Sequence, residues 1–417
     1  MIKAIKGTRD ILPPSSGVWN HVEDVARRIF RAYNYQEIRT PVFEETALFT
    51  RGVGEETDIV SKEMYTFEDR DRDKTSLTLR PENTAPVIRS YIEHRLDQQP
   101  GLQKLYYMGP MFRRERPQKG RYRQFYQIGA EVIGSESPAV DAEIIEMVTE
   151  ILTQSGLNGF KLFLNSVGCS NCRPAFVGAL KEKLNDAAPK MCEDCRRRVE
   201  TNPLRVLDCK VPEDQPIIET LPSILDHLCE VCEKHFRFVR NYLEDRDIPY
   251  EVRPRLVRGL DYYTRTTFEI THGALGAQNS VLGGGRYDGL AEMLDSKVHS
   301  PGMGFSIGED RLVMALEEAH PEMLLHSADL FIAPMGEEEL RHCGVLAREL
   351  RRKGICVELA LGGKLKRLME VANKIQARNV LIVGSDEIAA GTYTLKNMIT
   401  GEQESVNRSQ LADKLKK

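Results

Sequence analysis

Two strands joined by a polar loop, over residues 104–133, are the feature that most constrains how this chain folds. The second strand lies within YRQFYQIGAEVIG, and successive side chains of a strand point to opposite faces of its sheet. One face suits a hydrophobic core and carries Tyr126, Ile128, Ala130 and Val132. The other face is too polar for a core and carries Phe125, Gln127, Gly129 and Glu131. The alternation therefore predicts a strand with one core face and one face open to a ligand.

The polar face of this strand is the first candidate binding surface. Phe125 and Glu131 are separated along the strand by roughly 20 Å. That spacing suits an elongated ligand with an aromatic ring at one end and a hydrogen-bonding group at the other. Gly129, which has no side chain, is expected to leave room for this ligand above the sheet. An antiparallel strand with one solvated face would give the same pattern.

The loop between the two strands is strongly basic. Residues 113–123, RRERPQKGRYR, hold six basic residues and one acid, and Tyr122 and Phe125 flank the end of the loop. Basic and aromatic side chains together bind phosphate backbones and single-stranded ends of nucleic acids. A solvated hairpin tip is the alternative interpretation.

The N-terminal half of the chain also predicts helices and a short strand. An apolar stripe from Val18 to Tyr33 recurs at three- and four-residue steps and predicts a helix. YQEIRTPVFEE predicts a short strand that contains Pro41, at a sheet edge or an interface, because proline cannot donate to a ladder. Residues 169–254 differ from both neighbours, since they look helical and hold seven of the nine cysteines.

The C-terminal part of the chain changes character at Ser327. ADLFIAP, ICVELA and VLIVG predict buried strands, and residues 337–353 predict a helix. Alternation of strands and helices indicates a small α/β domain with parallel strands.

Composition limits the possible classes of protein. A chain of 417 residues suggests two or three domains. No apolar run approaches the ~20 residues of a membrane helix, and MIKAIKGTRD lacks the apolar segment of a secretory signal. Nine cysteines without an export signal favour the cytoplasm over a disulfide framework. The net charge of −4 excludes little, because a local basic patch is enough to bind nucleic acid.

Residues 256–270, LVRGLDYYTRTTFEI, gather groups suited to a charged and aromatic ligand. Arg258 is a permanent cation that suits a phosphate or a carboxylate. Tyr262 and Tyr263 offer flat walls and hydroxyl groups that donate and accept hydrogen bonds. The TRTTFEI run that follows predicts a strand.

These pieces together resemble the signature motifs of class II aminoacyl-tRNA synthetases. The stretch around Pro41 resembles motif 1, and the segment from FRRE (112–115) through the basic loop to Glu131 resembles motif 2. GMGFSIGEDRL (302–312), which contains Arg311, resembles motif 3.

Two further segments narrow the resemblance to histidyl-tRNA synthetases. They are LVRGLDYYTRTTFEI and GGGRYDGL (283–290), and the similarity extends from KGTRDILP at the start to the final α/β domain. Gly283, Gly284 and Gly285 are expected to allow close approach of the backbone to the substrate, although a tight turn would use the same residues.

The resemblance implies an α+β fold of the class II synthetase type. It consists of an antiparallel sheet flanked by helices, a helical insertion and a C-terminal α/β anticodon-binding domain. The expected boundaries are residues 1–168 and 255–322 for the catalytic core, 169–254 for the insertion and 327–417 for the last domain. Since motif 1 builds a dimer interface in the family, a homodimer is expected.

The activity implied is the ligation of histidine to tRNA(His) in two steps. Histidine and ATP give histidyl-adenylate, and the histidyl group then passes to the 3′ end of the tRNA. Arg113 and Arg258 are the expected catalytic residues, on opposite sides of the α-phosphate, because fixed cations must neutralise it during the attack. Phe125 and Arg311 are expected to sandwich the adenine. Mg²⁺ is expected on the β- and γ-phosphates, held mostly by ATP oxygens and water, with no protein metal ligand assigned.

Selection of histidine is implied to depend on two hydrogen bonds to the imidazole. Glu131 is expected to accept from its N–H, and the Tyr263 hydroxyl to donate to its other nitrogen. Polar groups left unpaired by an apolar competitor would then penalise that competitor. The other substrate-binding residues implied are Glu82, Asn83, Thr84, Gln127, Tyr262 and Tyr287.

The segment LRPENTA (79–85) supplies three of these residues. Glu82 and Thr84 are expected at the α-amino group of the substrate and Gln127 near its carboxylate, while the two tyrosines complete the pocket wall. The family usually has glycine where this chain has Asn83. A carboxylate placed like Glu82, directly after Pro81, also suits the N-terminus of a helix.

The cysteines of the insertion form three CxxC pairs, with Cys209 between the second and third. The pairs are Cys169 with Cys172, Cys192 with Cys195, and Cys229 with Cys232. Two pairs could hold one tetrahedral zinc ion, so structural zinc is possible, but three pairs exceed the needs of one site. Helical CxxC pairs are also found as buried thiols. The insertion is hypothesised to contact tRNA.

The C-terminal domain is implied to read the anticodon, and residues 341–367 hold eight Lys or Arg against two acids. A solvated charged face would have the same composition. Two other functions fit parts of the chain. One is the synthetase-like regulatory subunit of ATP phosphoribosyltransferase, and the other is an RNA-binding module without catalysis. The retained Arg113, Arg258 and Arg311 and the full final domain favour the enzyme.

Overall fold

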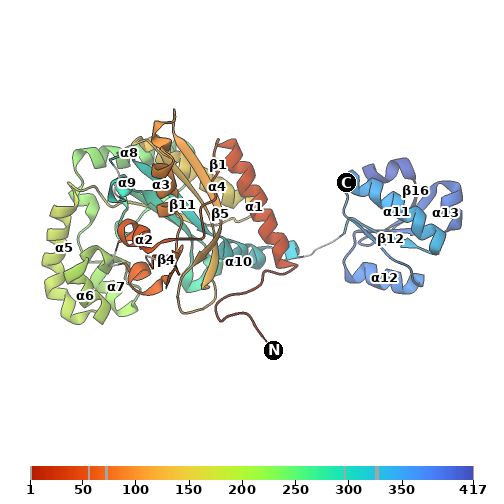
Figure 1. Ribbon diagram of the computed structural model, residues 1–417, viewed down its shortest axis with the longest axis horizontal. Helices are drawn as coiled ribbons and strands as arrows, with labels where there is room; N and C mark the ends of the chain where they lie inside the picture. Colours follow the sequence, from red (N-terminus) through yellow and green to blue (C-terminus); the bar gives the residue numbers. More distant parts are fainter. Residues whose placement is uncertain (1, 55–56, 71–73, 295–296, 325–327, 417) are drawn as a thin grey trace. The chain divides into compact units, whose positions relative to one another are not determined.

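The computed structural model describes residues 2–54, 57–70, 74–294, 297–324 and 328–416 (Figure 1). The chain forms two compact units. The first unit contains Val18–His320 with the N-terminal residues up to Ile11, and the second contains Pro321–Lys417 with Leu12–Gly17. Among the described residues no helix is long and apolar enough to cross a membrane.

The first unit is built on an eight-stranded sheet. Its five inner pairings are antiparallel, and the pairing at each edge is parallel. This confirms the antiparallel sheet expected from the sequence. In spatial order the strands are β1 (Gln36–Glu37), β5 (Gln103–Phe112), β6 (Gln124–Ile133), β11 (Gly302–Gly308), β10 (Ser280–Arg286), β9 (Thr264–Thr271), β7 (Lys161–Ser166) and β8 (Glu251–Val252).

The predicted hairpin over residues 104–133 is the β5–β6 pair, and its core face is covered by helices. On α1 (Ser15–Ala32), Trp19 packs edge-on against Tyr126 with ring centres 5.3 Å apart, and Phe30 stacks on Tyr106 at 4.4 Å. Helices α4 (Pro138–Ser155) and α10 (Glu309–Ala319) pack on β11 and β6. Ile128, Ala130 and Val132 are buried on this face, as the alternation predicted.

The segment around Pro41 differs from the single strand predicted there. The chain forms β1 and then β2 (Phe43–Glu45), and Pro41 lies between them outside any strand. β2 is an edge of a small sheet with β4 (Ser76–Leu79) and β3 (Tyr65–Glu68). The backbone carbonyls of Thr40 and Pro41 instead accept hydrogen bonds from Arg80. Helices α2 (Thr46–Val53) and α3 (Thr84–Glu93) pack against each other beside this sheet.

The segment between β7 and β8 is helical, as expected. Its helices are α5 (Arg173–Ala187), α6 (Glu193–Thr201), α7 (Gln215–Ile218) and α8 (Glu230–Glu244). Figure 1 shows α5, α6 and α7, in yellow-green, gathered on one side of the first unit. They share a hydrophobic core that includes Phe176, Leu180 and Leu184 together with buried cysteines.

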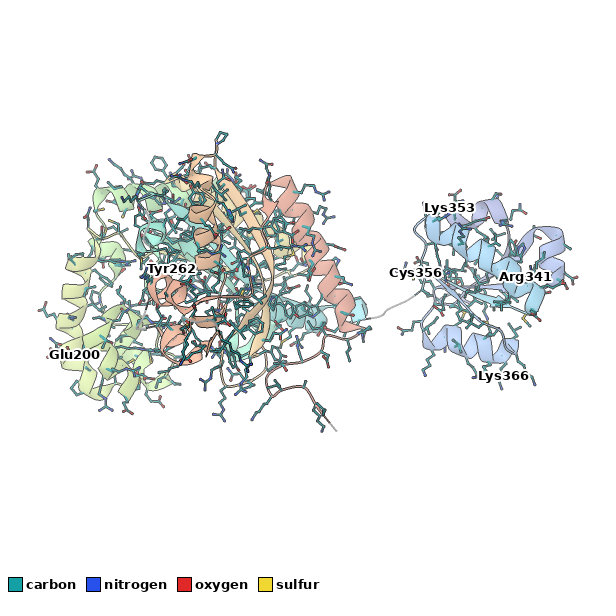
Figure 2. The ribbon with its side chains drawn as sticks, viewed as in Figure 1. Glu200, Tyr262, Arg341, Lys353, Cys356 and Lys366 are labelled. Carbon is teal, nitrogen blue, oxygen red and sulfur yellow. The ribbon has the colours of Figure 1, made fainter. Side chains whose placement is uncertain are left out.

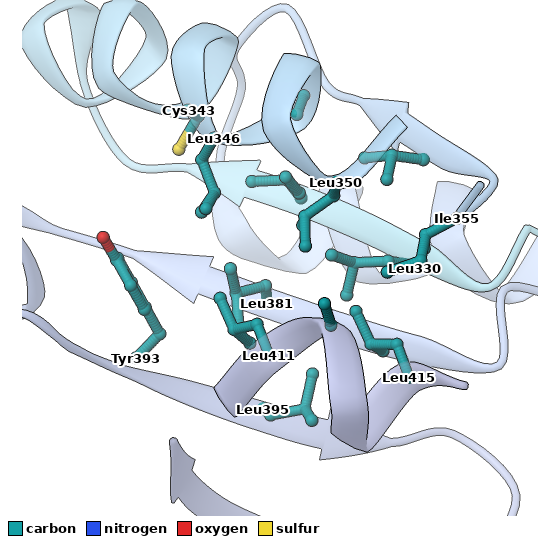
Figure 3. Close-up of a cluster of buried hydrophobic side chains, with 14 of the residues drawn as sticks. Leu330, Cys343, Leu346, Leu350, Ile355, Leu381, Tyr393, Leu395, Leu411 and Leu415 are labelled. Carbon is teal, nitrogen blue, oxygen red and sulfur yellow. The ribbon is translucent and has the colours of Figure 1, made fainter. Parts of the chain in front are cut away.

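The second unit is an α/β sheet with a conventional apolar core (Figure 3). β12 (Leu330–Pro334) pairs in parallel with β13 (Val357–Leu359) and β14 (Asn379–Val383), which confirms the predicted parallel strands. Two antiparallel strands that the sequence patterns did not predict, β15 (Thr392–Asn397) and β16 (Gln403–Asn407), extend the sheet. The helices of this unit are α11 (Glu337–Arg352), α12 (Leu365–Lys374), α13 (Ser385–Ala390) and α14 (Leu411–Leu415).

Candidate active site

One face of the eight-stranded sheet is built from small and polar residues. Directly paired residues of antiparallel strands share a face. By this register the surface consists of Gln127, Gly129 and Glu131 of β6, Gly304, Ser306 and Gly308 of β11, and Gly283 and Gly285 of β10. We refer to these eight residues as the glycine-rich face.

A cavity of about 190 Å³ opens on the glycine-rich face. Arg113 and Arg258, which are far apart in the sequence, both line it. The other predicted residues that line it are Glu82, Thr84, Phe125, Gln127, Tyr262, Tyr263, Tyr287 and Arg311. Figure 2 labels Tyr262 within the first unit. The sequence motifs therefore converge on a single cavity.

Arg258 is held at the cavity by an ion pair and by the small residue next to it. Its Nη1 lies 3.0 Å from Oε1 of Glu269 on β9. A Cβ atom at Gly283 would overlap the Arg258 guanidinium, so glycine at this position makes room for the arginine. Burial would lower the pKa of Arg258, but Glu269, Tyr263 and Asp208 together outweigh burial and raise the pKa. Arg258 thus presents a permanent positive charge.

Arg113 lies beside the aromatic residue predicted to stack on adenine. Its Nε donates to the Pro81 carbonyl at 2.9 Å, and its guanidinium carbon lies 5.1 Å from the centre of the Phe125 ring. The cavity is also lined by Glu115, Arg121 and Tyr122. The basic loop therefore contributes to the cavity and is more than a solvated hairpin tip.

Arg311 reaches the cavity from the first turn of α10. Its Nε donates to the carbonyl of Gly120 at 3.1 Å, and its Nη1 donates to the carbonyl of Ser280 at 2.8 Å. Burial lowers the pKa of Arg311 from its usual value. The two backbone contacts fix the plane of the guanidinium, as a group that covers a flat ring requires.

Glu82 caps a helix and also faces the cavity. Its carboxylate accepts from the backbone N–H groups of Thr84 at 2.8 Å and Ala85 at 3.0 Å, at the start of α3. The Tyr262 hydroxyl lies 3.4 Å from the same carboxylate. The helix N-terminal role and the position at the cavity predicted for Glu82 therefore occur together. Burial raises the pKa of Glu82, and the two backbone donors partly oppose that shift.

Glu131 lies behind the cavity wall and is not one of its lining residues. Its Oε1 accepts from the hydroxyls of Thr84 at 2.8 Å and Tyr107 at 3.4 Å, and its Oε2 accepts from Tyr287 at 2.6 Å. All three donors line the cavity. Burial raises the pKa of Glu131 to about 8, although the hydroxyl donors lower it. Glu131 therefore orients three hydroxyl groups that face the cavity.

Asn83 is the other predicted residue that does not line the cavity. Its Oδ1 accepts from the Thr40 hydroxyl at 2.6 Å and from Arg80 at 3.3 Å. These contacts join the segment before β2 to the start of α3. The placement gives no support to a substrate contact by Asn83.

The prediction that Gly129 leaves open space for the ligand was wrong, because the space above it is filled by a side chain. A Cβ atom at Gly129 would overlap the ring of Tyr107, and one at Gly285 would lie 2.8 Å from the ring of Tyr263. Gly304 likewise makes room for the Glu131 carboxylate. Each of these three glycines is thus matched to a large side chain of the site, because the packing there leaves no room for an added Cβ atom.

Sequence reasoning missed Tyr107, Glu269 and Ser306. Tyr107 and Ser306 line the cavity, and Glu269 is the counter-ion of Arg258. A signal for Tyr107 existed, since pairing of the two predicted strands places it opposite Gly129. A signal for Glu269 also existed, because a buried arginine requires a nearby acid and TRTTFEI contains one.

Groups that could hold a metal ion lie away from this cavity. Within the described part of the chain, two sets of four ligand atoms approach one another within 4.8 Å, and both lie in the insertion. They are Cys169, Cys172, Cys229 and Cys232, and Cys192, Cys195, Cys209 and Asp214.

Comparison with known proteins gives a consistent picture. Residues 7–312 match the family described as Histidyl-tRNA synthetase, and residues 329–417 match the family described as Anticodon binding domain. The chain is 71% identical to a histidine–tRNA ligase of Solibacter usitatus over 415 residues, which cover 100% of this chain and 99% of the relative. It is 58% identical to a histidine–tRNA ligase of Koribacter versatilis, with 99% and 95% covered.

A solved structure with the same fold is that of apo histidyl-tRNA synthetase from S. aureus. It is 40% identical in sequence, covers 100% of both chains and superposes with a TM-score of 0.78.

Proposed function

This chain belongs to the histidyl-tRNA synthetase family and is a histidine–tRNA ligase, and we propose that the cavity on the glycine-rich face is where it forms and transfers histidyl-adenylate. The observation that carries this proposal is the presence of Arg113 and Arg258 in one cavity with an aromatic ring and several hydroxyl groups. Two fixed cations and a flat surface are what a nucleotide phosphate and its base require.

In the first step, a carboxylate oxygen of histidine attacks the α-phosphorus of ATP. The bond from this phosphorus to the oxygen bridging to the β-phosphate breaks, and pyrophosphate leaves. Both reactants are negative, so the guanidinium groups of Arg113 and Arg258 neutralise the pentavalent transition state from two directions. Glu269 holds Arg258 in place by its 3.0 Å contact.

The nucleotide is held by groups around Arg113. We assign Phe125 to one face of the adenine and Arg311 to the other, since both line the cavity and Arg311 is fixed by two carbonyl groups. Mg²⁺ bound to ATP would be held mainly by phosphate oxygens and water and would offset the charge of the β- and γ-phosphates. Glu115, which lines the cavity and lies 3.8 Å from Arg113, would face that water shell.

Histidine is recognised by the hydroxyl-rich end of the cavity. Tyr263 donates to one imidazole nitrogen, and Glu131 orients the Tyr107 and Tyr287 hydroxyls, whose oxygens accept from the other. Glu82 and Thr84 hold the α-amino group, where the negative charge of Glu82 favours an ammonium ion. Gln127 lies on the glycine-rich face and is assigned to the substrate carboxylate.

In the second step, the 3′-terminal ribose hydroxyl of tRNA(His) attacks the histidyl carbonyl carbon and AMP leaves. We assign anticodon recognition to residues 327–417. All eight basic residues within 341–367 are exposed, and Figure 2 shows Arg341, Lys353 and Lys366 at the surface of the second unit. The remaining boundaries, 1–168 and 255–322 for the catalytic core and 169–254 for the insertion, are part of the proposal, as are a homodimer and a cytoplasmic location.

The test of these assignments is histidine-dependent exchange of pyrophosphate into ATP, measured without tRNA. Wild-type chain is expected to exchange with histidine and with none of the other common amino acids. Tyr263→Phe is expected to raise the KM for histidine and to leave the KM for ATP unchanged, because it removes one donor at the imidazole. Binding of histidine without exchange would fit a regulatory subunit, and no binding would fit an RNA-binding module. Either result would contradict the proposal.

A further inference from the structure

The seven cysteines of the insertion fall into two compact groups with none left over. The first group joins the CxxC pair after β7 to the pair at the start of α8, and it consists of Cys169, Cys172, Cys229 and Cys232. The second group joins the pair at the start of α6 to the segment that follows it, and it consists of Cys192, Cys195, Cys209 and Asp214. The fold therefore resolves which cysteine pairs act together.

In the first group, the distances between sulfur atoms are those expected for four ligands arranged tetrahedrally around one zinc ion. Cys169 Sγ lies 3.7 Å from Cys172 Sγ and 3.9 Å from Cys229 Sγ. Four sulfurs around one zinc ion at ~2.3 Å would be separated by about 3.8 Å. A disulfide would require about 2.05 Å. The spacing is that of a tetrahedral zinc site and not of a disulfide.

The backbone around the first group is shaped for close approach of its sulfurs. The N–H of Cys229 donates to Cys172 Sγ at 3.1 Å, so the backbone supplies a hydrogen bond to this sulfur. Gly168 precedes the group with φ +64°, and a Cβ atom there would lie 2.8 Å from the Cβ of Cys172. Only glycine combines that backbone conformation with that approach.

In the second group, a carboxylate takes the place of the fourth sulfur. Asp214 is only 1% exposed, and its Oδ2 lies 3.2 Å from Cys209 Sγ. Cys192 Sγ lies 3.9 Å from Cys209 Sγ. Among the residues that the structure describes, no Lys, Arg or His forms an ion pair with Asp214. The Asp214 carboxylate also accepts from the backbone N–H of Cys192 at 3.1 Å. A buried carboxylate without a nearby cationic side chain is costly, and a metal ion bound by the group would offset its charge.

We propose that the insertion binds two zinc ions, one through Cys169, Cys172, Cys229 and Cys232 and one through Cys192, Cys195, Cys209 and Asp214. Thiolate and carboxylate ligands in closed four-ligand sets are the coordination of structural zinc. The sites have no open ligand position and lie outside the cavity, so they serve the fold and not the chemistry.

The two sites also hold the segment that carries Arg258 and Tyr263. Arg173, directly after Cys172, donates to the backbone carbonyl of Tyr263. From the segment between Cys195 and Cys209, Arg205 donates to the carbonyl of Arg258 at 3.1 Å. Asn202, also in that segment, donates to Asp261 at 3.2 Å. Each zinc site therefore fixes a neighbouring contact to residues 258–263, and loss of zinc is expected to loosen this segment.

The test is the zinc content of the full-length chain, purified without chelator and measured by elemental analysis. About two zinc ions per chain are expected. After dialysis against a mild chelator, Cys172→Ser and Cys209→Ser are each expected to retain about one, because each disrupts one site. Asp214→Asn is expected to lose its second zinc at a lower chelator concentration than wild type. The matched controls are Cys356→Ser, an exposed thiol of the second unit (Figure 2), and Asp226→Asn, an exposed acid of the insertion, and both are expected to keep two.

A measurement on wild-type chain covers the case in which a variant does not fold. Metal-free chain reconstituted with cobalt is expected to show the intense visible bands of tetrahedral cobalt thiolate. The metal-free chain is expected to have a raised KM for histidine in pyrophosphate exchange. After reconstitution with cobalt, this KM is expected to return to that of the zinc-containing wild type. Absence of stoichiometric zinc, absence of the cobalt bands, or zinc lost equally from Cys356→Ser would overturn the two sites. An unchanged KM in the metal-free chain would overturn their link to residues 258–263.

Discussion

The two units of this chain bury different kinds of side chain. Among the described residues, every buried polar or charged side chain lies in the first unit, and examples are Glu82, Glu131 and Arg286. The buried residues described in the second unit are apolar, apart from the Tyr393 hydroxyl, which pairs with His342 at 2.8 Å. Buried polar groups are costly unless they are paired, and functional sites are where they are retained. The first unit therefore carries its chemistry inside, and the second presents its basic residues on the surface.

The largest effect that this contrast predicts is the loss of Arg258. Arg258→Ala removes a fixed charge that acts in the transition state, so pyrophosphate exchange is expected to fall by about 10²–10³-fold. Arg258→Lys is expected to recover only part of the rate, because lysine lacks the planar fork. Steady-state exchange with histidine and ATP measures both.

Arg237→Ala is the matched control, since Arg237 is exposed on α8. It is expected to exchange at the wild-type rate. If Arg258→Ala catalysed pyrophosphate exchange as fast as this control, the Arg258 charge would not contribute to catalysis.

A smaller effect is expected from filling a space in the glycine-rich face. Gly283→Ala places a Cβ atom where the Arg258 guanidinium lies, and overpacking of this kind costs about 1–3 kcal/mol. Exchange is expected to fall by about tenfold or more, because Arg258 must move. Gly289→Ala, which has no atom within 4 Å of the added Cβ, is expected to be neutral. Equal rates in the two variants would show that the glycine does not position Arg258.

The stability of the first unit is expected to depend on pH through a buried acid, Glu309, for which the described part of the second unit has no counterpart. Burial and the nearby Glu23 raise the pKa of Glu309 on α10 to about 9, so the folded chain keeps a proton that the unfolded chain releases above about pH 4.5. Stability of the first unit should therefore decrease as pH rises from about 5 to 9, by up to a few kcal/mol. Glu309→Gln is expected to raise the melting temperature more at pH 9 than at pH 5, as followed by calorimetry.

Glu318→Gln is the control for this measurement, since Glu318 is exposed on the same helix. It should change the melting temperature equally at both pH values. If the melting temperature of Glu309→Gln changed with pH in the same way as that of the wild type, Glu309 would be ionised in the folded chain.

The smallest effect is expected on the surface of the second unit. Lys366→Ala with Arg367→Ala removes two exposed cations from α12. The KM for tRNA(His) in aminoacylation should rise, and its salt dependence should fall by about one unit of slope for each phosphate that the variant no longer neutralises. Pyrophosphate exchange without tRNA should be unchanged. Lys374→Ala, at the other end of α12, is the control and is expected to leave the KM for tRNA(His) unchanged. A loss of pyrophosphate exchange in the double variant would contradict the division of roles between the two units.

Much of the fold could be predicted because its signals are local. Alternation from Phe125 to Val132 predicted the faces of β6, and strand–helix alternation predicted the parallel part of the second unit. The two antiparallel strands after residue 391 were missed. The strand around Pro41 was wrong, because Arg80 takes up the carbonyl groups that a ladder would have used.

The sequence predicted which residues belong to the site better than it predicted how their side chains are arranged. Motifs identified Arg113 and Arg258 as members of one cavity. They did not show that Glu131 is enclosed by hydroxyl groups, because that depends on the register of several strands. The grouping of the cysteines was undetermined for the same reason, since spacing along the chain does not decide which pairs meet in space.

The central claim is that Arg113 and Arg258 act on one phosphate group. Its most direct test is a double-mutant cycle on the rate of histidyl-adenylate formation in a single turnover, with Arg113→Ala, Arg258→Ala and the double variant. Groups that share one transition-state charge are coupled, so the double variant should lose less than the product of the two single losses, with a coupling energy of about 1 kcal/mol or more. Losses that multiply, to within about 0.5 kcal/mol, would contradict the claim.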